Sequence, residues 1–411
     1  MEQKNLWNKN FTILVIGQLI SLFGNAILRF ALPLYLLDIT ESATIFGLVL
    51  AFSVIPMIIL SPIGGIIADR ANKRNVMVIL DFGTSLLAFI IFILLGRVEA
   101  IPLIFSAMII LFAIQGAYQP TVQSSVPALQ KIDNLLPANA IVNQVNSLSG
   151  LLGPVTGGIL YAYWGLTPIL IISGISFFIS AILGLFIKIP YYKLPFEKNI
   201  LILVKKDFSE SIQFIKKEKP IILKTMYIVA TFNLFLTSMI LIGTPVLVTQ
   251  TLGLSSQFLG YAQGALMAGG VFGGIMVGIL RNRIKIQKAY ILLFGASLTM
   301  VPIGFTFFIN LSDIWSYTVL IVCVFLFMMI STIFSIQMLT FIQGETPQHL
   351  IGKVISCVLM LSLCAQPIGN ALYGILFDVF ENTVWIVIFI ALLSALIISF
   401  ISKNVFTKIK I

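Results

Sequence analysis

The feature that most constrains this chain is a series of unbroken apolar stretches, each about 20 to 28 residues long. A helix needs about 20 apolar residues to cross the roughly 30 Å hydrocarbon core of a bilayer, whereas the strands of a membrane barrel alternate apolar and polar residues. Hydrophobic residues make up 59% of the 411 residues and charged residues only 10%. These are too few charged residues to form the solvent-exposed surface of a soluble protein of this length. The sequence therefore predicts an all-α membrane protein.

Twelve such stretches fall into two sets of six, separated by a polar segment. We predict membrane-spanning helices over residues 11–37, 43–67, 76–95, 101–124, 139–163, 168–187, 221–248, 257–280, 289–309, 317–342, 350–377 and 384–401. The expected organisation is a six-helix bundle over 1–187, a cytoplasmic linker over 188–220 and a second six-helix bundle over 221–411. Within the linker, residues 199–219 predict an amphipathic helix on the membrane surface, with a solvated charged linker as the alternative.

The basic residues indicate the orientation of the chain. All but two of the 25 Lys and Arg lie at the termini or in the loops of one side; Arg29 is inside a span and Arg97 is in an opposite loop. Since cytoplasmic loops carry the excess of Lys and Arg, both termini are expected to be cytoplasmic, in the cell (inner or plasma) membrane. The net charge of +10 is thus explained by topology and lipid, and no nucleic-acid partner is expected.

Two short patterns recur in register in the two halves. Gln123-x-x-x-Pro127 matches Gln343-x-x-x-Pro347, and the stretch 153–160 matches 369–376 with glycines at corresponding places. Corresponding spans run in the same direction across the membrane. We therefore predict that the two bundles are related by a parallel pseudo-repeat.

The loop after the second span carries the most specific motif. Residues 65–74 read Gly-Ile-Ile-Ala-Asp-Arg-Ala-Asn-Lys-Arg, which resembles the major facilitator superfamily signature, with Asn72 in place of its second glycine. The alternative is a simple positive-inside anchor. The resemblance implies a gating role for Gly65, Asp69, Arg70 and Arg74, with Asp69 capping the start of the eleventh span.

The fifth span carries a second motif, Gly153-Pro154-x-x-Gly157-Gly158, which resembles that of antiporters in the same superfamily. Proline inside a helix permits a bend and glycine permits close helix approach, so a conformational role and simple packing with a passive kink both remain open. The runs 119–140 and 352–356 are similar to the macrolide-efflux-like branch. Phe112 stands where the superfamily often has an arginine, so the proton-handling role of that arginine is not carried over.

Polar side chains inside otherwise apolar spans are expected to face a cavity, because they are unfavourable in lipid. The candidates for a substrate cavity are Asn25, Arg29, Gln115, Gln119, Asn143, Asn233 and Gln366. Arg29 has two interpretations, a substrate or gating contact and a side chain that reaches the outer interface. Asp81 also has two interpretations, which are an ion pair with Arg70 or Arg74 and a role in proton transfer.

These observations predict a secondary active transporter that exports amphipathic small molecules, macrolide-type drugs among them, by alternating access. It would act as an antiporter with a proton or another coupling ion. An exporter of an endogenous metabolite, siderophore or lipid is the alternative, and a non-transporting membrane receptor or scaffold is a third. The sequence shows no catalytic constellation, cofactor motif or metal cluster, so no enzyme activity, no cofactor and no metal are expected, and we expect a monomer.

Overall fold

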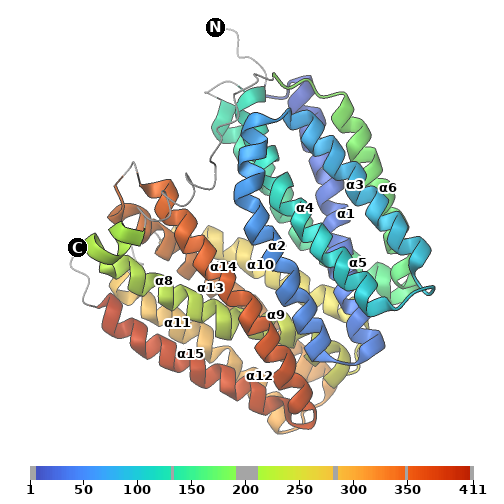
Figure 1. Cartoon of the computed structure of the whole chain (residues 1–411). Helices are drawn as coiled ribbons and strands as arrows, with labels where there is room; N and C mark the ends of the chain where they lie inside the picture. The colour runs from blue at the N-terminus through green and yellow to red at the C-terminus, as the bar shows by residue number, and fades with distance from the viewer. Residues whose placement is uncertain (1–5, 131–133, 191–211, 281–285, 348–349, 408–411) are drawn as a thin grey trace. The chain divides into compact units, whose positions relative to one another are not determined.

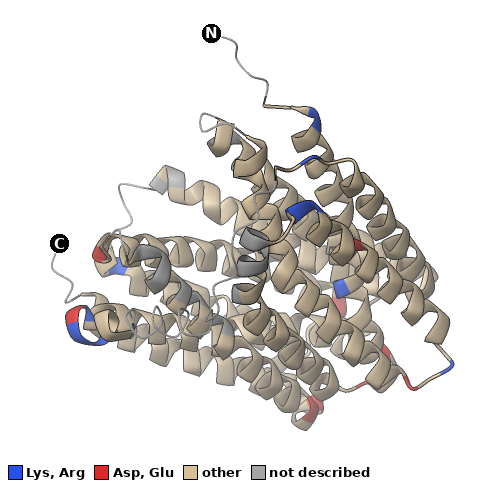
Figure 2. Cartoon of the chain, turned by 45° about the horizontal axis from the view of Figure 1, so that its top comes forward, with Lys and Arg blue, Asp and Glu red and all other residues tan. Residues whose placement is uncertain are grey.

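The computed structural model describes residues 6–130, 134–190, 212–280, 286–347 and 350–407. Almost all of these residues are helical, and no strand occurs among them. In that part of the chain, 10 segments are long and apolar enough to cross a membrane. Figure 2 shows long uncharged helical stretches with charged residues gathered mainly at their ends. The prediction of an all-helical membrane protein is confirmed, whereas the count of twelve spans and the pseudo-repeat stay predictions.

The chain divides into two compact units. Unit 1 comprises Met1–Glu41, Phe52–Phe196 and Ser255–Tyr261, and unit 2 comprises Ser42–Ala51, Glu197–Leu254 and Ala262–Ile411. The first turns of α2 therefore count with unit 2, and those of α10 with unit 1.

Unit 1 is built on the first six helices of the chain (Figure 1). They are α1 (Lys9–Thr40), α2 (Ala43–Arg70), α3 (Lys73–Leu94), α4 (Ala100–Leu129), α5 (Leu135–Trp164) and α6 (Leu166–Leu185). Asn8 starts α1 by accepting a hydrogen bond from the Phe11 amide, and Glu41 ends it in a left-handed conformation with φ 51°. Gly165, with φ 70°, makes the sharp change of direction between α5 and α6.

Small residues bring α1 and α6 close together. Ser180 Oγ on α6 lies 3.0 Å from the Gly17 carbonyl oxygen of α1, and Ser173 Oγ donates to the Gly24 carbonyl at 3.1 Å. A larger side chain at Gly24 would push the helices apart, because a Cβ there would already lie 3.1 Å from Ser176 Cβ. The close approach places polar groups of α6 directly beside α1.

Unit 2 contains the remaining helices, some of which have local irregularities. They are α8 (Pro220–Phe232), α9 (Ser238–Pro245), α10 (Ser256–Leu280), α11 (Ala289–Leu298), α12 (Met300–Phe308), α13 (Asp313–Glu345), α14 (Ile351–Val379) and α15 (Val384–Phe406). A π-helical turn, η3 (Asn233–Thr237), joins α8 to α9, and α11 meets α12 at Thr299. Pro220 starts α8, where its missing amide hydrogen is not needed.

Only the end of the predicted amphipathic segment is described. Residues 199–211 lie outside the described part of the chain, and η2 (Phe214–Glu218) is the helical part that follows. Ile215 is buried beside Phe214 in an apolar cluster with residues of α8 and α14, while Lys216 and Lys217 are exposed. The apolar and basic side chains of 214–217 thus differ in burial, and the amphipathic helix over 199–219 stays a prediction.

Each unit contains a helix crossing made by glycines. In unit 1, a Cβ at Gly158 of α5 would lie 2.6 Å from the Ser256 carbonyl oxygen and 2.8 Å from Gly260 Cα, at the start of α10. In unit 2, a Cβ at Gly374 of α14 would lie 2.6 Å from the Ala43 carbonyl oxygen at the start of α2. Gly158 and Gly374 are the residues paired by the predicted pseudo-repeat, which this likeness supports.

Asp378, near the end of α14, caps the first turn of α2. Its carboxylate accepts hydrogen bonds from Ser42 Oγ at 2.7 Å and from the backbone amides of Ala43 and Thr44 at 2.6 and 2.9 Å. All four residues belong to unit 2. An anion at a helix N-terminus satisfies amides that have no partner within the helix and interacts favourably with the helix dipole.

Replacing Asp378 with alanine is expected to lower the free energy of unfolding by about 1 kcal/mol, because the cap of α2 is lost. Asparagine should cost less, since its amide oxygen still accepts a hydrogen bond. The measurement is thermal unfolding of the detergent-purified protein, with Glu381→Ala as the control because Glu381 is exposed. Equal unfolding midpoints for Asp378→Ala and Glu381→Ala would contradict the capping role.

Candidate functional site

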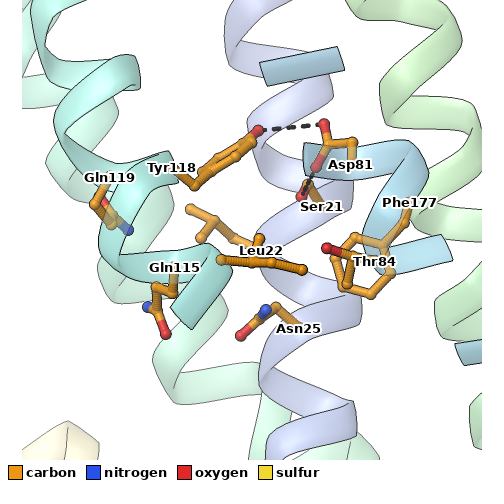
Figure 3. A pocket seen from close by; sticks show the side chains of 10 residues that line it. Ser21, Leu22, Asn25, Asp81, Thr84, Gln115, Tyr118, Gln119 and Phe177 are labelled. Carbon is orange, nitrogen blue, oxygen red and sulfur yellow. Dashed lines mark hydrogen bonds between the residues drawn. The ribbon is translucent and has the colours of Figure 1, made fainter. Parts of the chain in front are cut away.

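A small polar pocket lies inside unit 1, where α1, α3, α4 and α6 meet (Figure 3). It is lined by Ser21, Leu22, Asn25, Asp81, Thr84, Ile114, Gln115, Tyr118, Gln119 and Phe177. Its cavity volume is about 20 Å³, which is enough for a single water molecule. Drug-sized ligands occupy cavities of about 300–1,000 Å³, so this pocket suits water or a proton rather than an amphipathic molecule.

Three of the predicted cavity residues line this pocket. Asn25 of α1 and Gln115 and Gln119 of α4 face it, although they are far apart in the sequence (Figure 3). Gln119 Nε2 also donates to Asn146 Oδ1 of α5 at 3.1 Å. Asn143, one turn earlier on α5, is exposed in the structure and does not line the pocket.

The Arg29 side chain is directed at α4. Its Nη1 donates a hydrogen bond to Gln115 Oε1, and its guanidinium carbon lies 3.6 Å from the centroid of the Phe112 ring. A cation over an aromatic face is attracted by the ring quadrupole, so the two contacts act on the same charge. Of the two interpretations, this orientation favours a side chain inside the bundle over one that reaches the outer interface.

Asp81 is the most buried charged residue in the described part of unit 1, with 4% of its surface exposed. Ser21 Oγ of α1 lies 2.8 Å from Oδ1, while Ser180 Oγ of α6 and the Tyr118 hydroxyl of α4 lie 2.7 and 3.4 Å from Oδ2. The structure shows no ion pair of Asp81 with Arg74, whose Nε donates to Asn75 Oδ1. The side chain of Arg70 lies outside the described residues.

The hydroxyl groups around Asp81 were not among the predicted site residues. Ser21, Ser180 and Tyr118 stand on three different helices, and serine in a membrane span is also a common packing residue. The one available signal was Asp81 itself, because a carboxyl at that depth needs polar partners.

The predicted cavity residues of unit 2 lie beside the π-helical turn. Thr237 Oγ1 donates to Asn233 Oδ1 at 3.1 Å, and Ser238 Oγ lies 3.2 Å from the Gln366 carbonyl oxygen of α14. Asn233 and Gln366 therefore flank one helix contact, where a Cβ at Gly369 would collide with η3 and the first residue of α9. Extra residues in a helix turn often mark functional sites.

The motif residues of the fifth span pack against neighbouring helices. A Cβ at Gly153 would collide with Ala26 of α1, and one at Gly157 would lie 3.2 Å from the Phe30 ring. Pro154 lies inside the continuous helix α5. These contacts support the packing interpretation and leave a conformational role as a proposal.

The signature residues after the second span lie at the end of α2 and the start of α3. Gly65, Asp69 and Arg70 are in the last turns of α2, but their side chains lie outside the described residues, as does residue 353 at the start of α14. The expected cap of Asp69 on the eleventh span therefore stays a prediction. Arg74, which is described, is in the first turn of α3.

A bundle of apolar helices that encloses amides, an arginine and a carboxyl is the architecture of a membrane transporter rather than of a passive anchor. The chain belongs to the Major Facilitator Superfamily, whose family model matches residues 14–365. It is a transporter of that superfamily, and transporters of this kind act on small-molecule substrates.

Relatives and solved structures agree with this assignment. The chain is 23% identical to macrolide efflux protein A of Streptococcus pyogenes over 386 residues, which cover 92% of both chains. It is also 23% identical to the enterobactin exporter of Salmonella choleraesuis, over 89% of this chain and 84% of that protein. A bacterial homologue of the iron transporter ferroportin, solved in an inward-facing state, matches with a TM-score of 0.74 at 17% identity, over 97% of this chain and 99% of that one.

Proposed function

We propose that this protein is an ion-gradient-driven exporter of amphipathic small molecules that works by alternating access in the cell membrane. The observation that carries the proposal is the similarity to macrolide efflux protein A along nearly the whole of both chains. The amides of Asn25 and Gln115, which are half-buried on otherwise apolar helices, can offer hydrogen bonds to a neutral or mixed molecule. The proposed transporter has twelve spans in two six-helix bundles and acts as a monomer.

The test is transport by the purified full-length protein in liposomes. Radiolabelled erythromycin, a macrolide, should accumulate in protein-containing liposomes when a pH gradient is imposed, and the accumulation should collapse when an ionophore abolishes the gradient. Liposomes without protein give the background. No accumulation above that background for erythromycin would count against macrolide export.

The second candidate is export of an endogenous metabolite of the siderophore type. It is favoured by the similarity to the enterobactin exporter, again along most of the chain. Competition separates the two candidates, because a catecholate siderophore that is the true substrate should displace erythromycin or be transported in its place. A protein that moves neither probe, with or without a gradient, would instead fit a receptor or scaffold.

The topology proposed with this function can be tested by cysteine labelling. Single cysteines introduced at positions 206 and 403 should react with a membrane-impermeant maleimide only after the cells are opened, because both positions are expected on the cytoplasmic side. A cysteine at position 98, beside Arg97, should react in intact cells. The control is the protein with Cys323, Cys357 and Cys364 replaced by serine, which should not be labelled. Labelling of a cysteine at position 206 in intact cells would refute this topology.

A further inference from the structure

Asp81 is a buried carboxyl whose partners, in the part of the chain that the structure describes, are hydroxyl groups. Ser21, Ser180 and Tyr118 surround it, and among the described residues no cation interacts with it. An ionised carboxylate buried without a cation is strongly unfavourable, whereas a protonated carboxyl needs only ordinary hydrogen-bond partners. The surroundings of Asp81 therefore fit a neutral acid.

The hydrogen atoms available around Ser180 lead to the same conclusion. Ser180 Oγ lies 2.7 Å from Asp81 Oδ2 and 3.0 Å from the Gly17 carbonyl oxygen, and both distances are those of hydrogen bonds. A hydroxyl has one hydrogen to donate, and neither a carbonyl nor an ionised carboxylate can supply another. Both contacts are satisfied at once if Ser180 donates to Gly17 and Asp81 Oδ2 carries a proton that it donates to Ser180.

The helices packed around Asp81 present few other charged groups to it. From α1 the facing groups are Ser21 and Asn25, and the nearest cation on that helix is Arg29, which is engaged with Gln115. From α4 the titratable group is Tyr118, and from α6 the polar group is Ser180. The charge at this position is thus controlled by whether Asp81 holds a proton.

The pocket beside Asp81 has room for a partner in proton exchange. Asp81 lines a cavity with room for one water, whose other polar walls include Asn25, Gln115 and Gln119. Asp81 is eight residues along α3 from Lys73, about 12 Å from the start of the helix at 1.5 Å per residue. A water in this pocket would lie beside the carboxyl and could accept its proton.

We propose that Asp81, held by Ser21, Ser180 and Tyr118, is the site that binds the coupling proton of this transporter. This rests on the proposed ion-driven transport. When the O–H bond of Asp81 breaks, the proton passes to the pocket water and the electron pair stays on Oδ2. The Ser180 hydroxyl then donates its hydrogen bond to the carboxylate of Asp81 instead of to Gly17. The Gly17 carbonyl of α1 therefore loses its hydrogen-bond donor on α6. Loss of the proton thereby loosens the contact between α1 and α6, the two helices that carry Gly17 and Ser180.

The direct test is infrared spectroscopy of the purified full-length protein in lipid. At neutral pH the wild type should show the carbonyl stretching band of a protonated carboxylic acid, and Asp81→Asn should lack that band. Asp378→Asn is the matched control and should keep it, because Asp378 accepts from two backbone amides and is an ionised carboxylate. A band that persists unchanged in Asp81→Asn would overturn the proposal.

A second variant covers the case in which Asp81→Asn fails to fold. Ser180→Ala removes the acceptor of the Asp81 proton and leaves the carboxyl in place, so the same band should shift in frequency. Ser173→Ala is its control, because Ser173 bonds the Gly24 carbonyl on the same helix pair without touching Asp81. A band at the same frequency in Ser180→Ala and the wild type would contradict the assignment to Asp81.

Coupling is tested in the same liposomes with radiolabelled erythromycin. Asp81→Asn should lose accumulation driven by a pH gradient but keep exchange of labelled for unlabelled erythromycin, which needs no net proton movement. Gradient-driven accumulation at the wild-type level in Asp81→Asn would refute the coupling role. Failure of the wild type to move erythromycin would count against macrolide export alone, and the infrared band would still decide whether Asp81 holds a proton.

Discussion

Replacing Gly153 with leucine is expected to abolish the folded protein or reduce its yield severely. Even a Cβ at this position would collide with the Cβ of Ala26, and the Ala26 backbone atoms Cα and C lie only 3.3 Å away. The obstacle is therefore partly main chain, which cannot rotate aside as a flexible side chain can. We expect a loss greater than the about 1–3 kcal/mol that is typical of an overpacked core.

The matched control is Gly83→Leu. Gly83 is in the middle of α3, and no heavy atom lies within 4 Å of a Cβ built on it. The same substitution there adds apolar surface without a collision, so the folded yield should stay close to that of the wild type. Fluorescence-detected size-exclusion chromatography of membrane extracts measures both variants, and a similar monodisperse yield for the two would contradict the tight contact between α1 and α5.

Replacing Gln115 with leucine is expected to produce the second large effect. The substitution removes the acceptor of Arg29 Nη1 and leaves the guanidinium with its contact to the Phe112 ring but without that hydrogen bond. A hydrogen bond to a charged group contributes about 1.5–3 kcal/mol, and an uncompensated charge in the membrane interior adds to that loss. Thermal unfolding in detergent should show a clearly lowered midpoint.

A double-mutant cycle separates this pair from general damage to the bundle. Arg29→Met with Gln115→Leu replaces both partners by apolar side chains of similar length, which leaves no polar group without a partner. The double variant should therefore be more stable than Gln115→Leu alone, with a coupling between the two substitutions of the size found for residues in contact, about 0.5–3 kcal/mol. Additive losses would show that Arg29 and Gln115 do not interact in the folded protein.

The helical architecture could be predicted from the sequence because the bilayer fixes the length and composition of a spanning segment. The expected span 76–95 corresponds to α3 (Lys73–Leu94), and 168–187 corresponds to α6 (Leu166–Leu185), with ends that differ by a few residues. Polar ends next to continuous apolar runs are a strong local signal. The irregularities of unit 2, such as η3, depend on packing between helices and carry no comparable signal.

The pocket could be predicted only in part. Asn25, Gln115 and Gln119 were candidates because amides are rare in apolar spans, and the structure brings them to one cavity. Of the expected ion pair of Asp81 with Arg70 or Arg74, the structure shows no contact with Arg74, and the Arg70 side chain lies outside the described residues. The actual partners, Ser21 and Ser180, are 60 and 99 residues away, and their positions follow from which helix faces meet.

The pairing of Arg29 with Gln115 has a consequence for how the protein is made. The two residues are 86 positions apart, so α1 enters the membrane well before its acceptor on α4 has been synthesised. At about 5–20 residues per second, the ribosome needs roughly 4–17 s to add those residues. During that time Arg29 costs about 2.5–3.5 kcal/mol of insertion free energy without compensation from Gln115. Stable insertion of α1 in the bilayer thus depends on the later insertion of α4. Insertion and packing of unit 1 are therefore coupled.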